Sequence, residues 1–268
     1  MIATGVGPLA GAGRVGVRAA TQQALTIARR NLLHVRSDTE QLVGMTVQPL
    51  VLLALFVFVF GGAISGSSQE YLQFALPGVL VQAIAFSGLQ TALGLNVDFH
   101  RGVIDRFRSL PIARSAVIAG RILADGVRIS WAVFVFVGSG MALGFRLQGG
   151  VLAAVAALLL VVAFGVAVCW PMAFVGVSAR SAESVNTGGF LLIVPLTFAS
   201  STFAPPESMP GWLQTFVAVN PITSVVDATR ALMLGGPVTE PLVASLGWMV
   251  VITVVFAPLA VTRYHRRI

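Results

Sequence analysis

The chain has 268 residues, of which 56% are hydrophobic and only 10% are charged. Soluble domains carry about 25% charged residues, so this composition indicates a membrane protein. All 17 cationic side chains are arginines, and the lack of lysine excludes a P-loop lysine and a Schiff-base lysine within this chain. Any ATP hydrolysis that drives the protein must therefore take place in another subunit.

The formal net charge of +7 and the single cysteine bear on which partners and which structural sites the protein can have. A basic excess in an apolar chain marks cytoplasmic loops more often than a nucleic-acid surface, so no nucleic-acid partner is expected. Cys169 alone cannot form a disulfide or a cysteine-based zinc site within one chain. We expect neither a metal nor a cofactor in this chain.

Six stretches with little or no charge are long enough to cross a membrane, which takes about 20 apolar residues. The predicted spans are 44–64, 75–97, 124–145, 151–174, 187–204 and 242–262. The sequence thus predicts an all-α integral membrane protein with one six-span domain over 44–262, a cytoplasmic segment at 1–43 and a tail at 263–268. The uncharged stretch 208–226 is not counted, because its prolines and Asn220 disfavour a continuous helix.

The arginines lie mainly on one side of the predicted spans. Five precede the first span, five lie between the second and third, one follows the fourth and three follow the last, which makes 14. Arg146 and Arg230 lie on the other side, and Arg128 is at the start of the third span. The positive-inside rule then places both termini in the cytoplasm of a multi-pass protein of the plasma or inner membrane.

The segment between about 19 and 42 predicts an amphipathic helix. Its apolar and basic residues occupy separate helical faces, with Leu25, Ala28, Leu32 and Val35 on one and Arg18, Arg29 and Arg36 on the other. Such a helix lies along the cytoplasmic surface. It is either only attracted to anionic lipid or also mechanical, and the two interpretations are compatible.

The loop between the second and third spans, 98–121, predicts a short amphipathic cytoplasmic helix that ends at Pro111. Its apolar face consists of Phe99, Val103, Phe107 and Leu110, and another face carries Arg101, Asp105 and Arg108, with Arg106 beside Phe107 in the sequence. The apolar face packs either against the protein's own spans or in a groove on a separate soluble subunit. The residues alone leave both alternatives open.

Segment 205–241 is too apolar for a solvent-exposed loop. Asn220 and Pro221 divide it into two short helices, which predicts a re-entrant cap that dips into the outer leaflet, with Trp212 at headgroup depth. Asp227 and Arg230 are three residues apart and are predicted to pair within the second of these helices.

Motifs for chemistry are nearly absent. His100 and Asp105 have the H-x4-D spacing of glycerolipid acyltransferases, but no substrate-clamping motif accompanies them. Asp125 and Arg128 are predicted to pair near the cytoplasmic interface, because a lone charge inside a membrane is costly. The central parts of the other spans carry no acid, which argues against an ion-coupled carrier. The chain is therefore predicted to be non-catalytic and to draw its energy from another subunit.

Several short motifs follow one another along the chain. They are Asp105-Arg106-Phe107-Arg108-Ser109-Leu110-Pro111-Ile112, Gly120-Arg121, Asp125, Met209-Pro210-Gly211-Trp212-Leu213-Gln214, Asn220-Pro221, Asp227-Ala228-x-Arg230 and Gly235-Gly236-Pro237. In this order, and with six spans and both termini inside, the chain resembles the permease subunits of type-2 ABC exporters, in particular the daunorubicin- and doxorubicin-resistance class. The resemblance runs through nearly the whole chain.

The resemblance implies a half-channel that pairs with a second permease, identical or homologous, and with two ABC ATPase subunits that bind ATP and Mg. It makes 99–110 the coupling helix toward the ATPase, 17–40 a connecting helix at the interface and 205–237 the re-entrant cap. Closure of the ATPase dimer would tilt the spans through the coupling helix. Substrate would move between the two permeases along the first, second and fifth spans. The expected cargo is an amphiphilic drug or a lipid-like compound, although a family alone does not define cargo.

Two other functions stay open. One is a membrane scaffold that recruits a soluble partner through the 99–110 helix without transport. The other is a membrane enzyme that acts through His100 and Asp105.

Overall fold

The computed structural model describes residues 39–60, 62, 67–100 and 114–267, with side chains described within 47–59, 62, 67–100 and 120–264. Residues 19–38 of the predicted N-terminal helix, which include Arg29 and Arg36, lie outside the described residues. So do most of the predicted coupling positions, namely Arg101, Val103, Asp105, Arg106, Phe107, Arg108, Leu110 and Pro111.

Every regular element of the described residues is a helix, which confirms the all-α prediction for this part of the chain. The elements are α2 (Thr39–Leu55), the π-helix η1 (Phe56–Phe60), α4 (Ser68–His100), α6 (Arg114–Ala142), α7 (Gly150–Ser178), α8 (Ala182–Phe198), the 3-10 helix η2 (Pro206–Ser208), α9 (Gly211–Ala218), α10 (Pro221–Leu234) and α11 (Thr239–Arg267).

Four of these helices are long and apolar enough to cross a membrane: α4, α6 from Gly120 onward, α7 and α11 up to Tyr264. They correspond to the predicted second, third, fourth and sixth spans. The predicted first span contains α2 and η1, of which Val47–Val59 form a shorter apolar helix. The predicted fifth span overlaps α8 (Ala182–Phe198), which has 17 residues and begins and ends earlier than predicted. The first and fifth spans therefore stay predictions.

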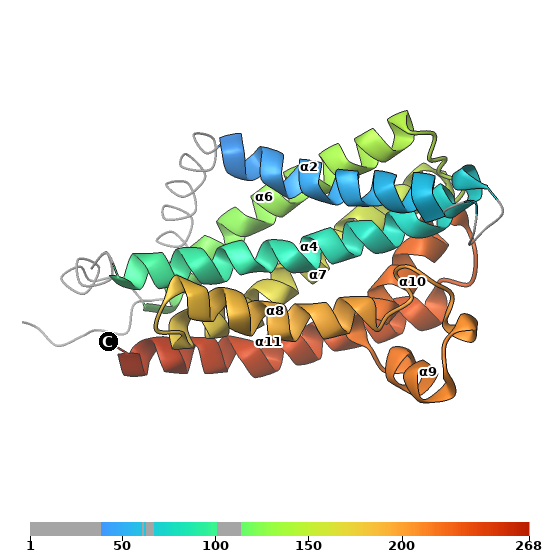
Figure 1. The fold of residues 1–268 in the computed structure, drawn as a ribbon. Helices are drawn as coiled ribbons and strands as arrows, with labels where there is room; N and C mark the ends of the chain where they lie inside the picture. The colour runs from blue at the N-terminus through green and yellow to red at the C-terminus, as the bar shows by residue number, and fades with distance from the viewer. Residues whose placement is uncertain (1–38, 61, 63–66, 101–113, 268) are drawn as a thin grey trace, which may run out of the picture.

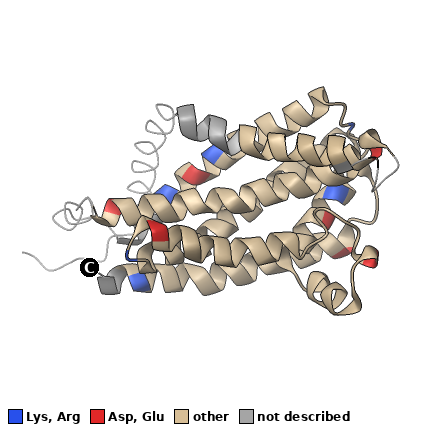
Figure 2. Ribbon diagram, viewed as in Figure 1, with Lys and Arg blue, Asp and Glu red and all other residues tan. Residues whose placement is uncertain are grey.

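The helices that run side by side along the long axis of the molecule are α2, α4, α6, α7, α8 and α11 (Figure 1). At one end, here called the loop end, α4 and α7 finish and α6 and α8 begin. At the other, here called the cap end, α9 and α10 lie beside the ends of the long helices. Figure 2 shows charged residues mostly toward these two ends, as expected for helices whose middle parts lie in lipid.

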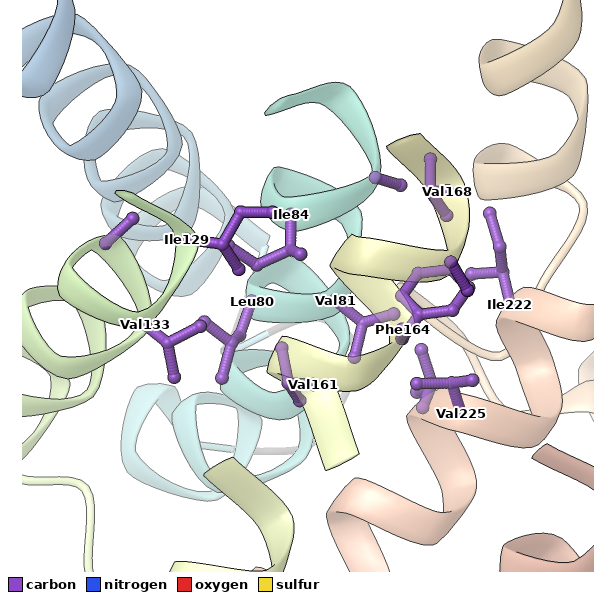
Figure 3. Packing of buried hydrophobic residues seen from close by; sticks show 14 of the residues in the cluster. Leu80, Val81, Ile84, Ile129, Val133, Val161, Phe164, Val168, Ile222 and Val225 are labelled. Carbon is purple, nitrogen blue, oxygen red and sulfur yellow. The ribbon is translucent and has the colours of Figure 1, made fainter. Parts of the chain in front are cut away.

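The core is centred on α4 and α7, with α6 on one side and α10 on the other (Figure 3). The labelled residues are all buried and come from these four helices: Leu80, Val81, Ile84, Ile129, Val133, Val161, Phe164, Val168, Ile222 and Val225. Lipid tails are as apolar as these side chains, so close van der Waals packing, rather than removal from water, holds the helices together.

A glycine brings the backbones of α4 and α7 into contact near the loop end. A methyl group at Gly176 would lie within 2.7 Å of Ala92 Cα and would also clash with the Ala92 carbonyl oxygen. Backbone atoms cannot turn aside as a flexible side chain can. Gly176→Ala is therefore expected to push the two helices apart and to lower the free energy of unfolding by about 1–3 kcal/mol.

Thermal unfolding of the detergent-solubilised chain measures this effect. Gly138→Ala is the matched control, because a methyl group at Gly138 on α6 would meet no atom within 4 Å. Equal melting temperatures for the two variants would contradict the proposed close approach of α4 and α7.

Candidate functional site

A buried ion pair lies between α4 and α6 in the half of the bundle nearer the loop end. Asp125 and Arg128, which are 3% and 4% exposed, place Oδ1 and Nη2 3.0 Å apart. The Arg128 nitrogen is close to the carboxylate but not aligned for a hydrogen bond. The Thr91 hydroxyl of α4 donates a 2.6 Å hydrogen bond to Asp125 Oδ2. The carboxylate thus belongs to α6 but is also held by α4.

Arg121 extends this pair toward the loop end. Its Nη1 lies 3.2 Å from Asp98 Oδ2 on α4, and its Nε lies 3.9 Å from Asp125 Oδ2. The Arg121 side chain crosses directly over Gly94, where even a methyl group would clash with the guanidinium. Acids and bases therefore alternate from Asp98 through Arg121 and Asp125 to Arg128, and the charges of this ladder cancel.

The charge ladder holds α4 and α6 together near the ends that the connection 101–113 joins. The sequence showed only the Asp125–Arg128 part of it, because these two residues share one helix. Arg121 falls at the preceding i−4 position of that face, which was an available signal. The contributions of Asp98 and Thr91 depend on how α4 and α6 lie against each other, and no spacing within one helix reveals that.

The end of α4 is also fixed to the connection between α7 and α8. The Asn96 side-chain amide donates to the carbonyls of Gly176 and Ala179 at 3.2 and 2.9 Å. His100 Nδ1 lies 2.8 Å from the Asn96 carbonyl, and Nε2 lies 3.0 Å from the carbonyl of Arg180. Both ring nitrogens thus have backbone partners, so the described contacts of His100 are those of a structural residue.

Phe99 is part of α4 rather than of a separate short helix, because α4 continues to His100. This corrects the predicted start of the coupling helix at residue 99. No proline or glycine interrupts the chain between Gly94 and His100, so the long helix runs on. The Phe99 ring packs against Tyr264 of α11, with centroids 5.3 Å apart and an angle of 63°. Of the two partners considered for the apolar face, Phe99 therefore contacts one of the protein's own helices.

A second polar cluster joins α10 to α4 at the cap end. Arg230 Nη1 lies 2.9 Å from Asp227 Oδ1, and its Nε and Nη2 donate to the carbonyls of Phe74 and Ser201 at 3.2 and 2.9 Å. The guanidinium also lies over the Phe74 ring, 4.1 Å from its centroid. The Ser201 hydroxyl donates a 2.6 Å hydrogen bond to Asp227. Burial raises the pKa of Asp227, while the hydrogen bond from Ser201 and the charge of Arg230 act in the opposite direction.

Asn220 links the end of α8 to the start of α10. Its side-chain amide donates to the carbonyls of Leu196 and Ala199 at 2.8 and 2.6 Å, and its Oδ1 accepts from the Ile222 amide at 2.9 Å. These bonds satisfy carbonyls at the end of one helix and an amide at the start of the next. Pro221 follows as the first residue of α10, a position that needs no backbone donor.

Trp212 lies apart from this cluster. It is in α9 and is 75% exposed, with no partner helix over it in the described part of the chain.

Asn220→Ala is expected to lower the free energy of unfolding by about 1–3 kcal/mol, because it removes the partner of two partly buried carbonyls and of one buried amide. Gln214→Ala is the matched control, because its amide bonds a single exposed carbonyl, that of Met209. Thermal unfolding of both variants in detergent tests this. If Asn220→Ala melts no lower than Gln214→Ala, Asn220 does not hold α8 and α10 together.

The described residues contain no group of three His, Cys, Asp or Glu side chains that could hold a metal ion. What they do contain is a bundle with four helices of membrane-spanning length and two polar clusters, one near each end. This arrangement defines a multi-pass membrane protein.

The chain belongs to the ABC-2 type transporter family, whose sequence model matches residues 22–234. It is 39% identical over 252 residues to the daunorubicin resistance ABC transporter permease protein DrrB1 of Streptomyces coeruleorubidus, covering 92% of this chain and 88% of that protein. It is 28% identical to the probable doxorubicin resistance ABC transporter permease protein DrrC of Mycobacterium tuberculosis, over 89% and 87% of the two chains. A putative transport permease, ycf38 of Cyanophora paradoxa, is 26% identical over 79% and 74%. These matches confirm the resemblance to type-2 ABC exporter permeases.

Proposed function

We propose that the chain is the transmembrane subunit of an ATP-driven exporter that moves an amphiphilic drug or lipid-like compound out of the cell. The observation that carries this proposal is the family match over 22–234, together with 39% identity to a permease named for daunorubicin resistance. The lack of lysine supports the division of labour, because a P-loop ATPase site needs one. ATP and Mg then bind in partner ATPase subunits, two per complex, and a second permease, identical or homologous, completes the channel.

The proposed topology has six spans and both termini in the cytoplasm. It counts α2 with η1 as the first span and α8 as the fifth, because both lie along the direction of the four long helices (Figure 1). The arginine distribution assigns the loop end to the cytoplasm and the cap end to the outer side. Segment 205–241 is then the re-entrant outer cap.

In this assembly α4 is the element that connects the ATPase to the outer cap. Its 33 residues form a rod about 50 Å long. At the cytoplasmic end it leads into the 101–113 connection, which contains most of the proposed coupling helix. At the outer end its Phe74 carbonyl accepts a hydrogen bond from Arg230 of α10.

The charge ladder makes α4 and α6 respond together. Both helices emerge from the same connection, and Asp98–Arg121 and Thr91–Asp125 link them side by side. A push on the coupling segment by the closing ATPase would therefore move the two helices as one body, and α10 would follow α4. The role of the protein is to transmit this motion, and the catalytic step takes place in the ATPase.

Purification of a tagged chain from native membranes in mild detergent tests the proposal. The expected result is that a P-loop ATPase copurifies and that charge reversal at Arg106 and Arg108 releases it. If no ATPase is recovered in several detergents, the scaffold alternative takes precedence. A partner that copurifies without nucleotide-dependent efflux of daunorubicin would also favour the scaffold.

A further inference from the structure

Three buried side-chain oxygen atoms of the described residues have no hydrogen-bond partner; Ser178 Oγ lies at the loop end of α7, and the other two lie farther inside the bundle. These two are Oε1 of Gln82 on α4 and Oγ1 of Thr223 on α10, in side chains that belong to residues 4% and 7% exposed. A buried polar atom without a partner is costly and rare in native structures. These two atoms therefore call for an explanation, and their positions in the helix register supply one.

Gln82 lies on the side of α4 that faces α8. Two contacts define this side. Gly78 approaches the backbone of Thr202, and the Leu89 side chain packs on Gly189 of α8. Gln82 follows Gly78 by one helical turn and precedes Leu89 by two. Gln82 therefore lies on the face of α4 that is turned toward the second half of α8.

Thr223 lies on the side of α10 that faces α4 and the residues just after α8, since Asp227 on that side bonds Ser201. It is four residues before Asp227 and seven before Arg230, so all three share one face of the helix. That face contacts Phe74 of α4 through Arg230. Since α4 and α10 run in opposite directions, the step from Arg230 to Thr223 (about 10 Å) parallels the step from Phe74 to Gln82 (about 12 Å).

We propose that Gln82 and Thr223 form a water-binding site between α4, α8 and α10. A water molecule there donates one hydrogen bond to the Gln82 carbonyl oxygen. It forms a second hydrogen bond with the Thr223 hydroxyl, in which either group can be the donor. The outer end of α10 is then held to α4 directly by Arg230, whereas its inner end is held through an exchangeable water. When α10 follows α4 through Arg230, its inner end is thus the part that can shift relative to α4. Only the purpose of that motion rests on the proposed transport function.

A double-mutant cycle on the full-length chain tests the site through the melting temperature in detergent. The variants are Thr223→Val, which keeps the shape but removes the hydroxyl, and Gln82→Met, which keeps the length but removes the amide. With a shared water, each single variant is expected to melt about 2–4 °C lower, because it strips one partner from the water. The double variant is expected to melt no lower than either single one, because both partners and the water are then gone.

Thr229→Val is the matched control on the same helix. Its hydroxyl is buried and bonded to the Val225 carbonyl at 2.7 Å, so its effect should add to that of Gln82→Met. If Thr223→Val and Gln82→Met each raise the melting temperature, the two oxygens have no water between them and the proposal is wrong. Additive losses in the double variant would equally overturn a shared site.

A direct image provides a second test, which does not depend on any variant folding. In a cryo-electron microscopy map that resolves other internal waters, density is expected within about 2.7–3.2 Å of both oxygens. A map without density at this position contradicts the proposal. Neither measurement depends on the ATPase or on cargo, so the water site can fail while the transport function stands, and the reverse.

Discussion

Asp125→Ala is expected to lower the free energy of unfolding by about 3–5 kcal/mol, because it leaves the buried Arg128 guanidinium without its carboxylate. The substitution also removes the acceptor of the Thr91 hydroxyl and hence a link between α4 and α6. Unfolding of the purified chain in detergent, followed by heat or by denaturant, measures the loss. Poor recovery from membranes is expected as well, since a loss of this size approaches the total stability of many proteins.

Two further variants separate charge burial from loss of packing. Asp98→Ala breaks the more exposed Asp98–Arg121 pair and should cost about 1 kcal/mol or less. The double variant Asp125→Leu/Arg128→Leu removes both charges and should recover most of the stability, because a buried pair can be replaced by apolar side chains. If the Asp125→Ala protein has the same free energy of unfolding as the wild type, the carboxylate does not neutralise Arg128.

Arg108→Glu is expected to reduce nucleotide-dependent export at least tenfold (about 1.4 kcal/mol in the coupling step) while the melting temperature stays unchanged. The proposed reason is that Arg108 lies in the 99–110 segment, where a reversed charge opposes docking of the ATPase. Export from cells or vesicles, normalised to the amount of folded permease, measures the effect. ATPase recovered in the same purification should fall in parallel.

His100→Ala is the control that separates transport from the enzyme hypothesis. The variant loses contacts with the carbonyls of Asn96 and Arg180 and should cost about 1 kcal/mol of stability. Export per folded molecule is expected to persist. An enzyme that used His100 as its base would give the opposite pattern, with activity lost in His100→Ala and nearly intact in Arg108→Glu.

Local patterns in the sequence were enough to predict the helical class and the approximate positions of the four helices of spanning length found in the described part of the chain. They also indicated the pairs Asp125–Arg128 and Asp227–Arg230, because both partners of each pair lie one turn apart on a single helix. Spacing of this kind is visible without a fold.

The remaining features depend on how helices lie against one another. Arg121 reaches Asp98 only because Gly94 leaves room for its side chain, which becomes evident once α4 and α6 are placed together. The end of α8 at Phe198 was likewise hidden, because the Asn220 amide that satisfies its last carbonyls comes from more than 20 residues later in the chain. The end of α4 was placed too early for a simpler reason. The charge at Asp98 does not stop the helix, and the next residue, Phe99, still packs against Tyr264 of α11.

Reconstitution of the chain with its copurified ATPase in proteoliposomes tests whether the complex exports an amphiphilic compound. The measured quantity is the ATP-dependent movement of a fluorescent amphiphilic drug across the vesicle membrane. Movement is expected to require ATP and Mg and to stop when the P-loop lysine of the ATPase is substituted. A complex that hydrolyses ATP but moves the drug no faster than vesicles without nucleotide would contradict the assignment of this chain as an amphiphile exporter.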